Sequence, residues 1–173
     1  VGGAGELQIT NDSNTLMAKN LAGAAFCYQE LGIYKKALEL NNAALRLHKM
    51  ANNKDQIGDC LSNIGSCYFY LSEFDKAIEY FTLTLQADRQ SGDSASIATS
   101  LSNLGMVYSR WGKHSQAIKF YEDALSYATS DKSKSIRYSK IGMSWYHMKH
   151  YDKALDYLNR ALDIEIRYNQ KIK

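Results

Sequence analysis

The stretch that decides the fold is written twice, as SNIGSCY at residues 62–68 and as SNLGMVY at residues 102–108. The two copies lie 40 residues apart. An internal period of about 20 to 50 residues is typical of proteins built from stacked structural repeats. In such an array each unit packs mainly on its neighbours, so the period predicts the architecture before any single helix is assigned.

The same spacing recurs along the chain in four alanines, Ala37, Ala77, Ala117 and Ala154, which are separated by 40, 40 and 37 residues. We call residues at one position of successive repeats a column. The columns predict four repeats, at about residues 18–57, 58–97, 98–134 and 135–173. Further columns are Leu21, Leu61, Leu101 and Tyr138; Ala25, Gly65, Gly105 and Gly142; Tyr34, Phe74, His114 and Tyr151; and Leu45, Leu85, Leu125 and Leu162.

Each repeat carries two apolar stripes. In the second repeat, apolar residues recur every three or four positions over residues 61–71 and again over residues 74–85. This spacing predicts two amphipathic helices with a short break between them. Asn53 and Asp93 are expected to cap the first helix of the next repeat. The residues expected to end the first helix of each pair are Gly32, Ser72, Gly112 and Lys149.

The glycine column has a packing explanation. Glycine inside a helix costs ~1 kcal/mol relative to alanine, yet this column contains it three times. Two helices approach closely only where one of them carries no bulky side chain. We therefore predict that Gly65, Gly105 and Gly142 lie at close contacts between helices.

These residues resemble the tetratricopeptide repeat over residues 18–173, with Leu-Gly, Tyr, Ala, an aromatic and Ala in order. The third repeat shows the pattern as Leu104-Gly105, Tyr108, Ala117, Tyr121 and Ala124. The resemblance implies an all-α fold, a right-handed superhelical solenoid of antiparallel helix pairs in one domain. The common repeat has about 34 residues and closes with proline, which is absent here. We therefore expect a longer second helix, as in repeats of kinesin light chains, Pins-type adaptors and bacterial receptors for signalling peptides.

Residues 1–17 are expected to lie outside the four repeats. Residues 9–17 align with the linker at residues 89–97, which predicts the end of a truncated preceding repeat. Residues 1–5, VGGAG, are typical of a flexible leader. At the other end, residues 162–166 keep an apolar edge, and we expect a monomer or weak self-association through exposed ends of the array.

Charge and cysteine content narrow the class of protein. The net charge of +3 comes without a run of basic residues, which argues against nucleic acid as a partner. No stretch approaches the ~20 apolar residues of a membrane span. The three cysteines lack metal-ligand or disulfide spacing; we expect reduced, buried thiols in a cytoplasmic protein. These cysteines are Cys27, Cys60 and Cys67.

Functional residues are expected on the first helix of each repeat, on the face opposite its packing stripe, which by the resemblance lines a concave groove. Apolar side chains with polar ones set among them indicate a binding surface, although they could instead cover one another. The predicted peptide-binding residues are Lys19, Phe26, Asp59, Asn63, Ser66, Phe69, Tyr70, Thr99, Asn103, Met106, Arg110, Lys140, Met143, Tyr146 and His147.

Asn63 and Asn103 share one column of this face, whereas Lys140 holds it in the fourth repeat. An asparagine amide both donates and accepts, and so matches the main chain of an extended peptide. In the resembling families an asparagine in this column makes that contact. The alternative is an asparagine satisfied by its neighbours or by solvent. Serines fill the columns where a clamp for chaperone tails needs Lys or Arg, so such tails are not expected.

The sequence therefore predicts a protein-protein interaction module that binds a peptide or helix of a partner, as part of a larger adaptor or sensor. Two alternatives stay open: a structural segment that self-associates or packs on the rest of its own protein, and a regulatory arm of an enzyme outside this chain. We expect no enzyme activity, cofactor or metal, because no nucleophile-elbow, P-loop or dinucleotide motif occurs and the histidines fall in different columns.

Overall fold

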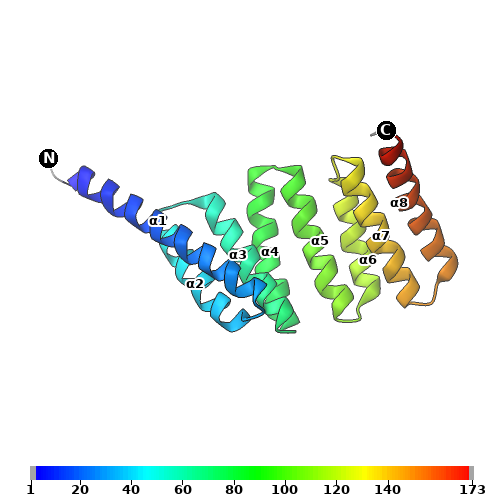
Figure 1. The fold of residues 1–173 in the computed structure, drawn as a ribbon, viewed down its shortest axis with the longest axis horizontal. Helices are drawn as coiled ribbons and strands as arrows, with labels where there is room; N and C mark the ends of the chain where they lie inside the picture. The colour runs from blue at the N-terminus through cyan, green and yellow to red at the C-terminus, as the bar shows by residue number, and fades with distance from the viewer. Residues whose placement is uncertain (1–2, 172–173) are drawn as a thin grey trace. The chain divides into compact units, whose positions relative to one another are not determined.

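The computed structural model describes the backbone of residues 3–171 and the side chains of residues 11–168 and 170. The described backbone forms helices and no strand, which confirms the all-α prediction (Figure 1). The helices are α1 (Gly3–Glu30), α2 (Tyr34–Met50), α3 (Lys54–Tyr70), α4 (Phe74–Ser91), α5 (Ser94–Arg110), α6 (His114–Ser126), α7 (Asp131–His147) and α8 (Tyr151–Lys171).

The chain divides into two compact units, residues 1–84 and residues 85–173. The single domain over residues 18–173 stays a prediction. In the first unit α1 packs on α2 and α2 packs on α3. In the second unit α5, α6, α7 and α8 pack in chain order. Both units thus contain helix pairs in which a first helix (α1, α3, α5 or α7) is followed by a second helix.

The close contact predicted for the glycine column is present in three repeats. A Cβ built on Gly105 would lie 2.6 Å from the ring of Tyr121, which is itself buried. A Cβ on Gly65 would lie 3.1 Å from the ring of Phe81. One on Gly142 would lie 2.8 Å from Leu158. The missing side chain on each first helix therefore makes room for a large side chain on the second helix.

The breaks between paired helices are left-handed caps, as the column of stop residues predicted. Gly32 and Gly112 have φ of 73° and 79°, and Ser72 and Lys149 adopt the same conformation with φ of 61° and 63°. In each case the next residue donates its N–H to a carbonyl five residues back, as Ile33 does to Tyr28 at 2.8 Å. This is the geometry of a Schellman cap.

Two of these caps carry a residue with a Cβ, which makes them sites for stabilisation. Lys149→Gly is expected to raise the free energy of unfolding by about 0.5–1 kcal/mol, because glycine adopts positive φ without steric cost. Lys119→Gly, at an exposed position in the middle of α6 (His114–Ser126), is the matched control and should cost about 1 kcal/mol. Thermal melting measures both. A lower melting temperature for Lys149→Gly would contradict the assignment of this cap.

Residues 9–17 belong to α1 and form no break of the kind found in the linker with which they align. That they end a preceding repeat stays a prediction. The break in the aligned linker contains Gly92, with φ of 75°. Residues 9–17 contain neither glycine nor proline, so nothing in them forces the helix to end. The leader predicted at residues 1–5 lies partly outside the described residues, and residues 3–5 are helical.

Both predicted N-cap positions are correct, but only one side chain caps. The Asp93 carboxylate accepts from the N–H groups of Ala95 and Ser96 at 3.2 and 3.1 Å. Asn53 precedes α3 without capping it. Its Nδ2 donates instead to Oγ1 of Thr15 at 2.9 Å, because α1 extends far enough to place an acceptor there.

The expectation of a longer second helix is met in α2, α4 and α8 but not in α6. α2, α4 and α8 have 17, 18 and 21 residues, whereas α6 has 13. The repeat that contains α6 is also the one with the 37-residue spacing. The shorter repeat therefore loses residues from its second helix and keeps a first helix, α5, of 17 residues.

The prediction of three buried thiols was wrong for Cys27, which is exposed, and correct for Cys60 and Cys67. Cys67 and Val107 share the column of Cys27 and are fully buried. Cys67 shares a buried cluster with Ala25 of α1 and Ala37 of α2, whereas no described helix precedes α1. Burial raises the pKa of the Cys60 thiol to about 11, so this thiol is neutral at physiological pH.

Candidate functional site

The residues predicted for binding lie on the first helix of each pair, and none of them is buried. In the first unit they come from α1 and α3, and in the second unit from α5 and α7. Those half-buried are Asn63, Ser66, Phe69, Asn103, Met106 and Lys140. Those exposed are Lys19, Phe26, Asp59, Tyr70, Thr99, Arg110, Met143, Tyr146 and His147.

Asn63 on α3 and Asn103 on α5 keep their side-chain amides uncommitted. Neither amide makes a hydrogen bond to any described residue of the protein. The backbone carbonyl of Asn63 accepts from Nε2 of Gln29 at 3.1 Å, so its helix is tied to α1 while its own side chain is not used. Each amide can therefore donate one hydrogen bond and accept another.

Two hydroxyl groups near these amides are already used. Oγ of Ser66 donates to the Ser62 carbonyl at 3.0 Å, and Oγ of Ser102 donates to the Ala98 carbonyl at 2.8 Å. These are bonds to the carbonyl four residues earlier in the same helix, a common habit of Ser and Thr in helices. Unlike these two hydroxyl groups, the amides of Asn63 and Asn103 remain available to a partner.

Aromatic rings lie beside the polar groups in the first unit. Tyr70 is 58% exposed, and its ring stacks on Tyr34 of α2 with centroids 4.9 Å apart and planes 7° apart. Phe69 meets Tyr70 edge-on at 5.2 Å. The stack holds the Tyr70 ring in place while leaving more than half of the residue accessible.

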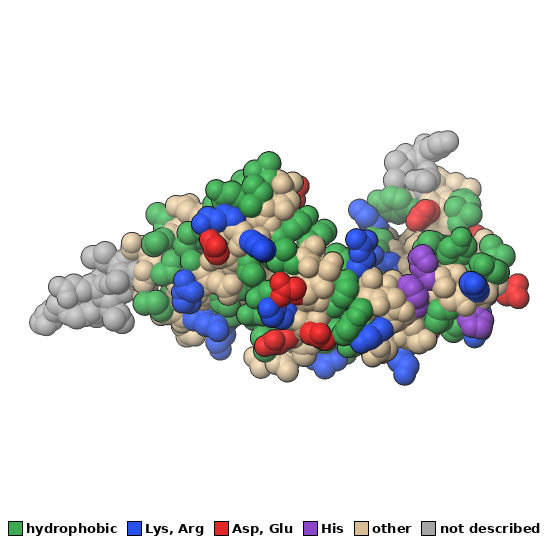
Figure 2. Space-filling view, turned by 90° about the horizontal axis from the view of Figure 1, so that it is seen from below, with side chains coloured by type: hydrophobic (Ala, Val, Ile, Leu, Met, Phe, Trp, Pro, Cys, Tyr) green, Lys and Arg blue, Asp and Glu red, His purple; other side chains and the backbone are tan. Residues whose placement is uncertain are grey.

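The second unit repeats this ring pair with histidines. His147 of α7 stacks on His114 of α6 at 4.9 Å and 11°, in the same columns as Tyr70 and Tyr34. Tyr146 is 51% exposed and meets Tyr151 of α8 at 5.8 Å. Figure 2 shows histidine side chains of this unit (purple) beside hydrophobic ones (green) on one face.

The ring contacts made by Tyr34, His114 and Tyr151 of the second helices were not predicted from the sequence. A signal for them existed, because all three stand in one aromatic column. Comparing that column with the last residue of the following first helix, at Tyr70 and His147, would have indicated a recurring contact.

The charges on the two faces differ. The second unit contributes Arg110 and Lys140, and the Lys140 ammonium lies 5.8 Å from the ring centroid of Tyr121. The first unit contributes Asp59 and Lys19, both exposed. The second face is therefore the more basic of the two.

The histidine stack gives the fold a pH dependence. Burial, and then the neighbouring His147, hold the pKa of His114 below its ordinary value of 6.5. Nδ1 of His114 is buried without a hydrogen-bond partner. Below pH 6.5 the unfolded chain takes up a proton that the folded chain resists, so the free energy of unfolding falls as the pH is lowered. Burial lowers the pKa of His48 in the same direction.

His114→Phe is expected to make the free energy of unfolding less dependent on pH between pH 7 and pH 5. Phenylalanine fits because Phe74 holds the same column, and its ring cannot take up a proton. Denaturant unfolding at several pH values measures the change, which is at most ~1.4 kcal/mol per pH unit for one proton. A dependence identical to that of the wild type would contradict the assignment of a shifted pKa to His114.

The described residues contain no group of three or more histidine, cysteine or acidic side chains arranged to hold a metal ion. Among them, no helix has both the length and the apolar character needed to cross a membrane.

Solved structures similar to this chain are helical repeat proteins. BtubC from P. vanneervenii is 22% identical, with a TM-score of 0.81, and the match covers 90% of this chain and 66% of that one. A putative kinesin light chain from Podosopora anserina with nearly identical TPR-like repeats is 14% identical, with a TM-score of 0.73 and coverages of 87% and 76%.

A signal transduction ATPase with a tetratricopeptide repeat sensor, from Pyrococcus horikoshii, is 20% identical. Its TM-score is 0.80, and the match covers 91% of this chain but 25% of the ATPase. At these identities the three likenesses show the fold alone. No curated protein sequence matches.

The family model of the tetratricopeptide repeat matches residues 14–90 and 59–130, which together span more than half of the sequence. Its matches overlap the repeats that contain Gly65 and Gly105, where the close helix contacts were found. The chain therefore belongs to the tetratricopeptide repeat family.

Proposed function

We propose that this chain is a protein-binding module whose first helices hold an extended peptide segment of a partner protein, within a larger adaptor or sensor. The observation that carries this proposal is the repeated, uncommitted asparagine. Asn63 and Asn103 stand one repeat apart, one in each unit, and neither amide bonds to another residue that the structure describes. A main chain in extended conformation offers alternating N–H and C=O groups, and an asparagine amide pairs with both.

The rings and apolar side chains around the amides support the same proposal. Tyr70 and Tyr146 are more than half exposed and are held by neighbouring rings. Exposed, rigidly held tyrosines bury much area in an interface at low entropic cost. Met143 is 45% exposed and adds an adaptable apolar contact. Such side chains would receive the side chains of the bound segment.

The family supports an interaction role in general, because tetratricopeptide repeats act as scaffolds for protein contacts. One structural neighbour carries its repeats as a sensor attached to an ATPase. A similar arrangement would make this chain the recognition part of a longer protein. Two unpaired, buried thiols, Cys60 and Cys67, fit a reducing cytoplasm.

A displayed library of random peptides, selected against the purified chain, provides a ligand with which to test this function. The enriched peptide should bind Asn63→Ala/Asn103→Ala about tenfold to a hundredfold more weakly than the wild type. Each lost amide pair contributes about 0.5–1.5 kcal/mol, and 1.4 kcal/mol corresponds to a tenfold change in affinity.

Asn42→Ala/Asn159→Ala is the matched control, with one asparagine removed from a second helix in each unit. The Asn42 amide donates to the Leu38 carbonyl of its own helix at 2.9 Å, so this pair should leave the affinity unchanged. Failure to enrich any peptide, or equal losses in both double variants, would argue against a peptide-binding role for the first helices.

A further inference from the structure

One arginine of the second unit is buried without a counter-charge. Arg137 of α7 is 7% exposed. Its Nη1 donates to the carbonyl oxygen and to Oγ of Ser133, both at 2.8 Å. Its Nε is buried without a hydrogen-bond partner, and its Nη2 bonds to no described residue. No carboxylate of a described residue pairs with this guanidinium, so its charge is not compensated within the described part of the chain.

Arg137 keeps its charge in spite of this burial. Burial lowers the pKa of Arg137, and no nearby carboxylate offsets the effect. An arginine side chain nevertheless stays protonated throughout the physiological pH range. A buried charge without a partner destabilises a folded chain. An anion that reaches the guanidinium should therefore stabilise the folded state.

The columns show why the third repeat supplies no carboxylate here. Ser100 of α5 holds the column of Arg137, and its Oγ donates to the carboxylate of Asp88 on α4. In the third repeat Ala128 holds the column of Asp88, and α6 ends before it, at Ser126. This repeat therefore has a cation in place of the hydroxyl group and lacks the acidic partner.

The free edge of the guanidinium is the one that binds oxyanions side-on. The N–H groups of Nε and Nη2 point in the same direction within the plane of the group, and they match two oxygens of a carboxylate or a phosphate. In Arg137 these are the two nitrogens without a partner, because Ser133 uses Nη1. Nη2 is not fully enclosed as Nε is, so an ion can approach from its side.

The first turn of α7 adds positive potential to this place. Ser133 is the third residue of α7, so the guanidinium reaches back toward the N-terminus of a 17-residue helix. The N-terminal end of a helix dipole is positive and favours anions. Lys132 and Lys134 of the same turn are exposed. Asp131 is the acidic residue of this turn, and it makes no ion pair with Arg137.

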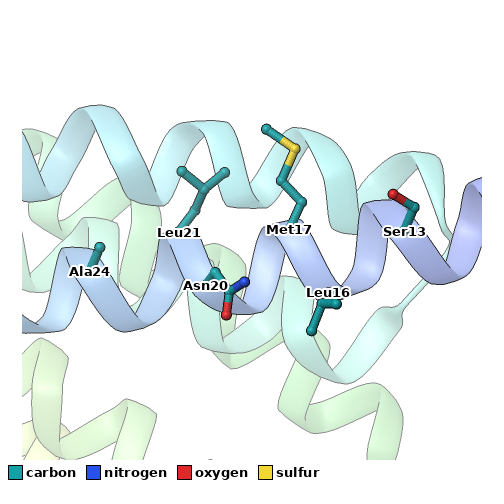
Figure 3. Close-up of a pocket in the computed structure, with 6 residues that line it drawn as sticks. All are labelled: Ser13, Leu16, Met17, Asn20, Leu21 and Ala24. Atoms are coloured by element: carbon teal, nitrogen blue, oxygen red, sulfur yellow. The ribbon is translucent and has the colours of Figure 1, made fainter.

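Two hollows on the surface of the described residues do not offer the same combination. One, on α1, has a volume of about 380 Å³ and is lined by uncharged side chains, among them Leu16 and Asn20 (Figure 3). The other, between α7 and α8, contains aspartates as well as basic residues, and its Arg160 is paired with Asp156 at 2.8 Å. Arg137 differs from both in that its charge is buried and uncompensated.

We propose that Arg137 binds a small oxyanion, a phosphate or a small carboxylate, through Nε and Nη2 beside the first turn of α7. The low exposure of this side chain admits a small ion and excludes a protein segment. The bound ion supplies the counter-charge that Asp88 would supply in the preceding repeat. Ser100 in the same column contacts α4, so the site lies apart from the proposed peptide-binding face and does not depend on that function.

Thermal unfolding of the full chain in chloride, acetate and phosphate, at one pH and one ionic strength, tests the proposal. Relative to chloride, phosphate or acetate should raise the melting temperature of the wild type. Above the dissociation constant, the rise should be about 3–6 °C for each tenfold increase in anion concentration. A response to phosphate alone assigns the site to phosphate, and a response to acetate as well extends it to carboxylates; both support the site.

Arg137→Met removes the guanidinium and keeps an unbranched side chain. This variant should lose the specific response and retain only the general effect of salts that are excluded from protein surfaces. Arg46→Met, at an exposed arginine of α2, is the matched control and should respond like the wild type. An equal response of the wild type and Arg137→Met would overturn the proposal, as would a wild type that melts at the same temperature in all three salts.

A measurement on the wild type alone keeps the proposal testable if Arg137→Met does not fold. The Nε–H signal of Arg137 in a nitrogen–proton correlation spectrum can be assigned through its bonds to the backbone. Titration with phosphate or acetate should shift this signal to a plateau, with the dissociation constant found by thermal unfolding. A signal that stays in place with both anions would also overturn the proposal.

Discussion

Gly105→Leu is expected to lower the free energy of unfolding by about 3 kcal/mol, the upper end of the range for overpacked sites. The first carbon added at this position would lie 2.6 Å from the Tyr121 ring, which is too close for any real contact. Tyr121 is 2% exposed, so its ring has no solvent-filled space into which it can move. A leucine adds three further carbons to the same contact.

Gly58→Ala is the control for this prediction. Gly58 is also helical, but a Cβ there would meet nothing within 4 Å. The same loss of glycine should therefore stabilise the chain by about 0.5–1 kcal/mol through helix propensity. Denaturant unfolding of both variants gives the comparison. A Gly105→Leu protein as stable as the wild type would show that the glycine column does not exist for close packing.

Phe81→Ala is expected to lower the free energy of unfolding by about 3–5 kcal/mol, the range for removing a buried phenylalanine. Phe81 is fully buried, and its ring lies against the open position of Gly65. Alanine at this position would leave a cavity facing a residue that has no side chain with which to fill it. The melting temperature should fall by roughly 2–4 °C for each kcal/mol lost.

Leu83→Ala on the same helix provides the scale for this effect. Leu83 is 40% exposed, so its truncation creates no buried cavity. The loss in free energy of unfolding should be well under half of that for Phe81→Ala. Similar losses for Phe81→Ala and Leu83→Ala would mean that contacts within α4, and not the packing of α4 on α3, determine stability in the first unit.

The sequence was sufficient to predict what depends on residues one repeat apart. The left-handed caps at Ser72 and Lys149 could be located although neither is glycine, because Gly32 and Gly112 mark their column. The glycine contacts could be predicted in the same way. Glycine destabilises a helix, so its recurrence in one column indicates the same close contact in each repeat. Both inferences use local geometry that every repeat reproduces.

What the sequence could not predict depends on neighbours that differ between repeats. Cys27 and Cys67 occupy one column, but Cys67 is buried by a preceding helix pair and Cys27 is exposed. Asn53 occupies an N-cap position, yet its amide turns to Thr15 because α1 is longer than its register indicates. The ring pair of His114 and His147 requires knowledge of which second helix meets which first helix.

We propose that packing and binding are divided between two sides of the same helices. Gly65 and Gly105 pack on their second helices. The amides of Asn63 and Asn103, two residues earlier in each case, have no partner among the described residues. Substitutions on one side should therefore change stability, and substitutions on the other should change affinity.

Titration of the selected peptide against Asn63→Ala/Asn103→Ala, together with the melting curve of the same variant, tests this claim most directly. We expect an affinity weakened by about tenfold to a hundredfold with a melting temperature close to that of the wild type. An unchanged affinity accompanied by a lower melting temperature would contradict it, because the asparagines would then serve the fold and not a partner.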